Sequence, residues 1–267
     1  MFLALGFVLS TLGLLYAGLR FTRQQRRLSR LAHALPVIRT WQAAHPLTKL
    51  TKESVDFSAR IARLTDCLPQ DTLIALREAA LAGHAADRSL IPGHKRGSTL
   101  SYDTLLAVAP EIIAFYLSPS LHALCSNIVG EPLVPVPVGD QSACSVLLYE
   151  RPGDHIGWHY DYDFYRGRHF TVLLSVENHG HGADGLSSAR LEVRRKGSDD
   201  TSYPTPPNAL VIFEGQRVLH RATALSEGER RVLISMTFCT DPSASLIADL
   251  ARRAKDMAYF GPRALWI

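Results

Sequence analysis

The sequence predicts an α+β fold in which a helical region precedes an antiparallel β-barrel, behind an N-terminal transmembrane helix. Three observations lead to this expectation. The first 19 residues contain no charged side chain, apolar residues recur at three- and four-residue intervals through much of 53–128, and short β-rich segments follow Pro137. The 267 residues, 46% of them hydrophobic, suffice for one domain with a sizeable core.

Residues 1–19 are expected to form a single membrane anchor. A 19-residue helix is about 28 Å long, close to the hydrocarbon thickness of a bilayer. A cleaved signal peptide, the first alternative, would carry its positive charges before the apolar run and a small-x-small cleavage site after it. A buried soluble helix, the second alternative, would be apolar on one stripe rather than all round. Five arginines follow the run at once: Arg20, Arg23, Arg26, Arg27 and Arg30. By the positive-inside rule, the rest of this single-pass chain lies on the cytoplasmic side.

The positive charge of the chain belongs to its N-terminal end. The formal net charge is +4, but residues 1–60 hold nine Lys or Arg against only Glu53 and Asp56. The remaining residues carry slightly more acidic than basic side chains. Because phosphate recognition needs a basic surface on the domain that binds, we expect no nucleic-acid partner. The arginine-rich flank suits anionic lipid headgroups instead.

Between the anchor and the C-terminus we expect four parts. Residues 20–50 read as a basic juxtamembrane tether, and 51–130 as a helical region that starts the domain 51–267. The barrel core is expected over 140–240. Its segments are 142–150, 169–177, 190–195, 208–214 and 230–239, with Gly, Pro, Asn or Asp between most of them. In the helical region, helices are predicted over 53–82 and over 104–128, the second of them broken near Pro119. A C-terminal helix is predicted over 242–259, with Asp241 as its cap.

One segment of the β-region carries a candidate metal site. His159 and Asp161 are two residues apart, so on an extended chain both side chains leave the same face. His220 follows a strand and a glycine turn, at the start of the next predicted strand. Two imidazoles and one carboxylate on a β-scaffold form the facial triad of non-haem Fe(II) centres, which leaves coordination positions open. Asp163 is an alternative carboxylate, but its spacing from His159 fits poorly.

These residues belong to a longer ordered pattern. The sequence resembles the prolyl-hydroxylase-type branch of the Fe(II)/2-oxoglutarate-dependent oxygenase superfamily over roughly residues 140–240. The resemblance implies a double-stranded β-helix, the jelly-roll or cupin-like barrel, with packing helices. The matching positions are Tyr149, Pro152, Gly153, His159, Asp161, Phe213, Gly215, His220, Arg221, Gly228 and Arg230.

The resemblance assigns roles to these positions. It implies that His159, Asp161 and His220 bind Fe(II), with 2-oxoglutarate and O2 as co-substrates. Arg230 would pair with the distal carboxylate of 2-oxoglutarate, and Tyr149 would hydrogen-bond it. Arg231 is the alternative, because alternation along a strand lets only one of two neighbouring arginines face inward, and the Gly-x-Arg spacing favours Arg230.

A narrower resemblance concerns the reaction and its substrate. The string from Gly153 to Asp161 is similar to amino-acid hydroxylases and radical halogenases of lysine-halogenase type. Those halogenases lack the carboxylate ligand, whereas this chain keeps Asp161, so the resemblance implies hydroxylation with release of succinate and CO2. The substrate would be an amino acid, or a membrane-associated molecule if the anchor holds. Two further hypotheses are a cupin-like metal-binding module without turnover, and a membrane-anchored scaffold without metal.

Overall fold

The structure, a computed structural model, describes residues 2–47, 55–82, 86–91, 93–195, 197 and 199–261. It describes no side chains for residues 2–16, 19, 20 and 90. Residues 48–50 of the predicted tether lie outside the described part, as do 51–54 and 262–267 at the two ends of the predicted domain.

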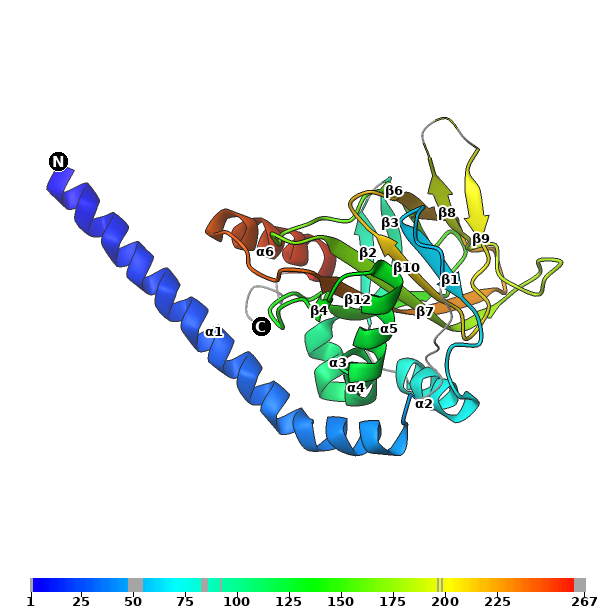
Figure 1. Ribbon diagram of the computed structural model, residues 1–267. Helices are drawn as coiled ribbons and strands as arrows, with labels where there is room; N and C mark the ends of the chain where they lie inside the picture. Colours follow the sequence, from blue (N-terminus) through cyan, green and yellow to red (C-terminus); the bar gives the residue numbers. More distant parts are fainter. Residues whose placement is uncertain are drawn as a thin grey trace.

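The predicted antiparallel β-core is present as one curled sheet that forms a half-barrel (Figure 1). Within the described residues its strands follow the order β1-β10-β7-β12-β5-β3-β6-β11-β8-β9, with β2 on β3 and β4 on β12. Strand β3 joins two parts of the curled sheet: its residues Ser98 to Leu100 pair with β5, and its first residues Lys95 and Arg96 pair with β6. The five segments predicted from composition correspond to β5 Cys144–Tyr149, β7 His169–His179, β8 Leu191–Arg194, β10 Leu210–Glu214 and β12 Arg230–Cys239.

The remaining strands lie outside these five segments, although the sequence predicted that a strand starts at His220, in β11. They are β1 Ile61–Leu64, β2 Asp87–Ile91, β3 Lys95–Leu100, β4 Val134–Pro135, β6 His155–His159, β9 Thr201–Tyr203 and β11 Leu219–Ala222. Strand β1 interrupts the helix predicted over 53–82, which is confirmed only as α2, Gln70–Leu81. Ile61 to Leu64 pair with the edge of β10 and bury their apolar side chains there.

Side chains alternate between two hydrophobic cores, as the period of a strand requires. On β12, Val232, Ile234 and Met236 pack into the core that the helices cover. Leu233 belongs to the second core, between the two faces of the curled sheet. The functional pocket lies on this inner side.

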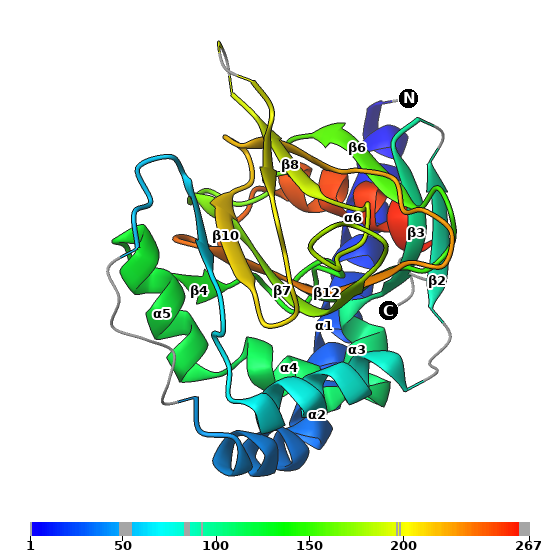
Figure 2. The same ribbon diagram turned by 90° about the vertical axis from the view of Figure 1, so that its right-hand side faces the viewer.

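Four short helices cover the outer face of the sheet. The helix predicted over 104–128 is present but broken twice, into α3 Tyr102–Val108, α4 Pro110–Tyr116 and α5 Pro119–Val129. Pro110 and Pro119 each stand at the first turn of a helix, where proline is tolerated because its missing N–H is not needed. Helix α2 contacts β7, and α3 contacts β5. Figures 1 and 2 both show α2, α3 and α4 together beside the sheet.

The predicted tether is largely helical, which corrects the expected organisation of 20–50. Helix α1 runs from Phe2 to Ala44, contacts α3 and α4, and has its last turns below α4 in the view of Figure 1. Ala34, Ile38 and Trp41 are buried in the helical core, and the Gln42 side-chain amide donates to the carbonyl oxygen of Ala114 at 2.8 Å. The segment is ordered because its apolar residues three and four apart form a face that α4 covers.

The expected membrane anchor falls mostly on residues 1–16, whose side chains lie outside the described part of the structure. Among the residues that are described, no single helix has both the length and the apolar character needed to cross a membrane. The bent pair α4–α5, with an angle of 42° between its helices, meets those criteria by length and composition only. Both of its helices have buried faces in the helical core.

The C-terminal helix is present as α6, Leu246–Phe260. Its N-cap is Ser245, whose hydroxyl accepts from the backbone N–H of Ala248 at 3.1 Å, and not the predicted Asp241. Asp241 instead accepts from the backbone N–H of Ser243 in the turn before the helix. Helix α6 contacts β2 and places its last turn against the inner pocket.

Candidate functional site

The two predicted histidine ligands come from paired antiparallel strands. His159 ends β6, His220 is the second residue of β11, and the two lie opposite each other in the register. Each Nδ1 lies near the carbonyl oxygen two residues earlier on its own strand, at 2.8 Å from Gly157 and 2.9 Å from Val218. With Nδ1 carrying the proton in these contacts, both Nε2 atoms keep a free lone pair, as metal-ligating histidines require.

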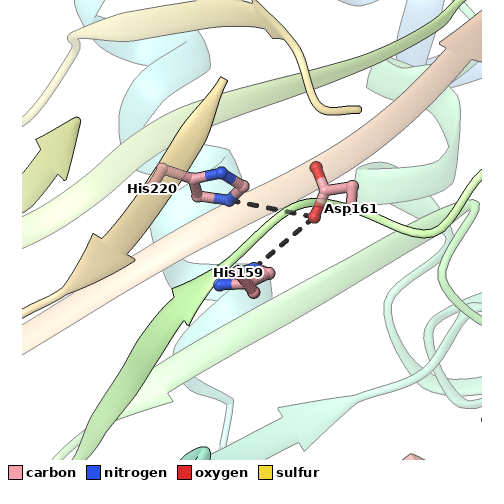
Figure 3. A group of neighbouring side chains, drawn as sticks. All are labelled: His159, Asp161 and His220. Carbon is pink, nitrogen blue, oxygen red and sulfur yellow. Dashed lines mark ion pairs between the residues drawn. The ribbon is translucent and has the colours of Figure 1, made fainter. Parts of the chain in front are cut away.

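Asp161 completes the triad from the loop that follows β6 (Figure 3). Its Oδ1 lies 3.5 Å from His159 Nε2 and 3.8 Å from His220 Nε2. The three candidate ligand atoms all lie within 4.8 Å of one another. The backbone N–H of Asp161 donates to the carbonyl of Gly215 at 3.0 Å, which fixes the loop against the turn after β10. The structure therefore brings together all three metal ligands expected from the sequence.

Two residues support the carboxylate. Thr171 on β7 donates its hydroxyl to Asp161 Oδ2 at 2.5 Å, leaving Oδ1 directed at the histidines. A Cβ atom added at Gly215 would lie 2.7 Å from Asp161 Cβ and 2.8 Å from its Cγ, closer than side chains pack. Gly215 belongs to the sequence pattern, but neither it nor Thr171 could be assigned this contact without the fold.

The protonation states suit a metal ion. Burial alone would raise the pKa of Asp161, but the adjacent imidazoles of His220 and His159 hold that pKa well below its usual range. Burial lowers the pKa of His220, which keeps its imidazole neutral near pH 7. An ionised carboxylate and a neutral imidazole are the forms that coordinate metal. Two imidazole nitrogens and one carboxylate oxygen on strand ends fit Fe(II) and leave positions for other ligands.

The predicted partner of 2-oxoglutarate requires a correction. Arg230 does not face the pocket: it forms an ion pair with Glu150 at 2.5 Å and has a side chain that is 35% exposed. Its neighbour Arg231 lines the pocket and is 1% exposed. The inward-facing arginine of β12 is therefore Arg231, the alternative, and not Arg230, which the Gly-x-Arg spacing favoured.

Arg231 is a buried cation without a counter-ion. Its Nη2 lies 3.4 Å from the hydroxyl of Thr205, its Nε has no hydrogen-bond partner, and none of the described carboxylates lies within ion-pair distance. Tyr149, the second predicted residue for this role, also lines the pocket, opposite Arg231 in the β5–β12 register. A buried guanidinium of this kind fits the carboxylate of a ligand.

Comparison with known proteins agrees with this geometry. No protein-family model matches the sequence, and no curated protein matches it. Solved structures do match. A prolyl hydroxylase from Trichoplax adhaerens, in complex with a hypoxia-inducible-factor peptide, has a TM-score of 0.55 at 16% identity, over 69% of this chain and 86% of its own. The carbocyclase SnoK of nogalamycin biosynthesis, described as non-haem and α-ketoglutarate-dependent, has a TM-score of 0.55 at 14% identity, over 76% and 90%.

A third match includes bound ligands. The epimerase SnoN, solved with Fe3+, α-ketoglutarate and nogalamycin RO, has a TM-score of 0.51 at 15% identity, over 67% of this chain and 78% of its own. The three proteins are described as a hydroxylase, a carbocyclase and an epimerase, so their likeness at this identity concerns the fold. The chain has the fold of the Fe(II)/2-oxoglutarate-dependent oxygenase superfamily, the same superfamily that its motifs resemble.

Proposed function

We propose that the chain is an Fe(II)/2-oxoglutarate-dependent dioxygenase that hydroxylates its substrate and releases succinate and CO2. The observation that carries the proposal is the shared pocket. The triad of His159, Asp161 and His220 and the unpaired guanidinium of Arg231 line the same cavity. A metal-binding module without turnover has no use for a buried cation beside its metal, and burying such a charge without a partner is costly.

Each residue has a distinct task in the proposed reaction. His159, Asp161 and His220 would hold Fe(II), which together with 2-oxoglutarate and O2 supplies the oxidising chemistry. Arg231 would pair with the distal carboxylate of 2-oxoglutarate. Burial raises the pKa of Tyr149, so its phenol stays protonated and can donate a hydrogen bond to that carboxylate. The apolar side chains of Leu173, Phe213 and Leu233 line the same cavity and exclude water from it.

Hydroxylation is the reaction that Asp161 supports. The carboxylate occupies the position that a halide would need, and Thr171 holds it there. We propose an amino-acid-type or membrane-associated molecule as the substrate, as the local resemblance and the apolar N-terminus suggest. The epimerase and the carbocyclase among the structural matches are the reason to test the reaction directly.

We also propose that residues 1–19 anchor the chain in a membrane, with the catalytic domain on the cytoplasmic side. The proposal is supported by the uncharged run and by the arginines that follow it. Fractionation of cells that express the full chain tests it. Release of the protein by high-salt or carbonate washing, rather than by detergent only, would contradict an anchor.

The catalytic proposal is tested on the full chain in detergent. Fe(II), 2-oxoglutarate and O2 are supplied, and succinate is measured beside an Asp161→Ala variant. We expect iron-dependent succinate formation that Asp161→Ala abolishes. Iron binding without succinate would indicate the cupin-like module instead, and succinate that is independent of iron would overturn the proposal.

A further inference from the structure

The pocket contains a second buried cation, Lys95. It is the first residue of β3, its side chain faces the inside of the barrel, and the residue is 7% exposed. The ammonium donates to the hydroxyl of Thr99 at 3.0 Å and lies 5.2 Å from the ring centroid of Tyr259. Neither partner carries a negative charge.

The contrast with Lys255 shows that the missing counter-ion is specific to Lys95. Lys255 on α6 lines the same pocket, but its ammonium pairs with Asp140 at 3.2 Å and with Asp256 at 3.1 Å. Among the described residues, no carboxylate lies within 4 Å of the Lys95 ammonium. A buried ammonium that keeps two of its three N–H groups unused needs a polar partner from elsewhere.

Lys95 is close to the metal site through its neighbours. The ring of His94 packs edge-on against the ring of the ligand His159, with centroids 5.4 Å apart. His94 Nε2 is in turn 2.7 Å from the hydroxyl of Tyr259, whose ring faces the Lys95 ammonium. Lys95, Tyr259 and the candidate ligand His159 all line the same pocket, so a molecule bound at Lys95 would share this cavity with the metal site.

A second polar atom in the pocket also lacks a partner. His169, at the start of β7, is 6% exposed, and its Nδ1 makes no hydrogen bond. It lines the cavity together with Lys95 and the hydroxyl residues Ser145, Ser235 and Thr237. The pocket therefore offers a polar atom beyond the triad and Arg231 that has no hydrogen-bond partner within the described residues.

The co-substrate does not account for Lys95. In the proposed reaction Arg231 would pair with one carboxylate of 2-oxoglutarate, and the rest of the co-substrate would lie at the metal that His159, Asp161 and His220 would hold. We propose that the substrate carries an anionic group, a carboxylate or a phosphate, and that Lys95 binds it beside the metal centre. The inference rests on the proposed function in one respect, which is that the bound anion belongs to the substrate of an enzyme. Anion binding at Lys95 itself can be tested without iron.

The first experiment measures anion binding alone. The protein used is the metal-free, full-length Arg231→Met variant, in which the other buried cation is removed. It is titrated with sodium phosphate and with sodium acetate, and sodium chloride of equal ionic strength is the control. We expect phosphate or acetate to raise the melting temperature, and the stronger of the two identifies the anionic group. Adding Lys95→Met should weaken the binding at least about tenfold, as expected for a lost charge-assisted hydrogen bond.

The stability of the variants separates a binding role from a structural one. Methionine has a similar length to lysine and needs no counter-ion, so Lys95→Met should melt no lower than the parent protein when no anion is present. Arg96→Met is the matched control, because Arg96 is the next residue of β3 and its side chain is 47% exposed. We expect it to leave anion binding intact. If Lys95→Met does not fold, Lys95→Gln replaces it in the same comparison.

The second experiment uses iron-loaded enzyme and matched pairs of compounds. Each pair joins an acid to its neutral counterpart: N-acetyl amino acids with their C-terminal amides, and glycerol 3-phosphate with glycerol. Substrate-stimulated succinate formation should appear with acids and not with their neutral partners. A neutral compound that is hydroxylated equally well by Lys95→Met would overturn the inference, as would anion binding that this variant retains. Absence of succinate with every compound would contradict the proposed function, while the first experiment would still decide on Lys95.

Discussion

Arg231 and Tyr149 lie opposite each other on two paired strands, and both point into the barrel. The guanidinium carbon of Arg231 is 5.5 Å from the centroid of the Tyr149 ring. Arg230, one residue earlier, is turned outward and pairs with Glu150. Two adjacent arginines of the same strand therefore have different surroundings, which makes them a matched pair for experiment.

Replacing Arg231 should weaken the binding of 2-oxoglutarate. Of Arg230 and Arg231, only Arg231 lines the cavity, and Arg231→Met removes its guanidinium. We expect the KM for 2-oxoglutarate to rise about 10- to 100-fold, which is the usual loss of affinity when hydrogen bonds to a charged group are removed. Arg230→Met should change it by less than about threefold, because that side chain is partly exposed. Succinate formation at varied 2-oxoglutarate checks both variants, and a larger effect at Arg230 would contradict the assignment.

Removing the hydroxyl of Thr171 should weaken iron binding. Thr171→Val keeps the shape of the side chain but loses the hydrogen bond that holds Asp161 Oδ2. Loss of such a supporting contact commonly costs about 10- to 100-fold in metal affinity. Fe(II) titration under anaerobic conditions measures it. Thr237→Val, which removes a hydroxyl from the same pocket, should leave the affinity close to that of the wild type.

A methyl group at Gly215 should displace the carboxylate ligand. The Cβ of a Gly215→Ala variant would overlap Asp161, whose loop is fixed to the backbone of the same residue. We expect iron binding to be lost while the circular dichroism of the protein remains that of a folded chain. Gly18→Ala is the control, because nothing lies within 4 Å of the added atom. Normal iron affinity in Gly215→Ala would show that the loop moves freely.

Lys95 should make the free energy of unfolding increase with pH above about pH 8. Burial, and then the nearby Lys255, lower the pKa of Lys95 from 10.5 to about 8. Between about pH 8 and 10.5 the unfolded chain therefore binds more protons at this position than the folded one, and the contribution of Lys95 to stability rises with pH. The difference between wild type and Lys95→Met in urea unfolding isolates this contribution. At most it amounts to about 3.5 kcal/mol, since one pKa unit corresponds to about 1.4 kcal/mol. A flat difference across that window would contradict the lowered pKa.

The C-terminal half of α1 should behave as part of the domain. Trp41 is 7% exposed, whereas Val37 on the same helix is 45% exposed. We expect Trp41→Ala to lower the free energy of unfolding by about 3 kcal/mol, as large-to-small changes in a core do. Val37→Ala should lower it by less than about 0.5 kcal/mol. Denaturant titration measures both, and equal values would mean that α1 does not pack on the domain.

The candidate metal ligands could be predicted from sequence partly by a local rule and partly by resemblance. A spacing of two places His159 and Asp161 on one face of an extended chain, whereas the role of His220 came from the ordered pattern that resembles the oxygenase superfamily. The strands of the core are marked by their β-rich composition. The phase of β12 could not be predicted in the same way. Alternation shows that only one of two neighbouring arginines faces inward, but which of them does is decided by the pairing of Arg231 with Tyr149 on another strand.

Other parts of the site depend entirely on tertiary contacts. Lys95 precedes His159 by 64 residues and lies in a strand with the sequence KRGSTL, which has no alternating apolar pattern. The strand exists because it pairs with β5 and β6. Residues 20–50 were expected to form a tether, yet Pro36 is accommodated inside α1 while its neighbours pack on α4. The tertiary contacts of β3 and of α1, rather than local composition alone, decide both outcomes.

The pairing of His159 with His220 has a mechanical consequence. Few residues of β6 pair with residues of β11, and the register is irregular between His220 and Ala222, so few backbone hydrogen bonds hold the two strands together. A metal ion bound by one histidine from each strand would cross-link them. Separation of these two strands would then require release of the metal ion. Amide hydrogen exchange in β6 and β11 should therefore be slower when the metal site is occupied than when it is empty.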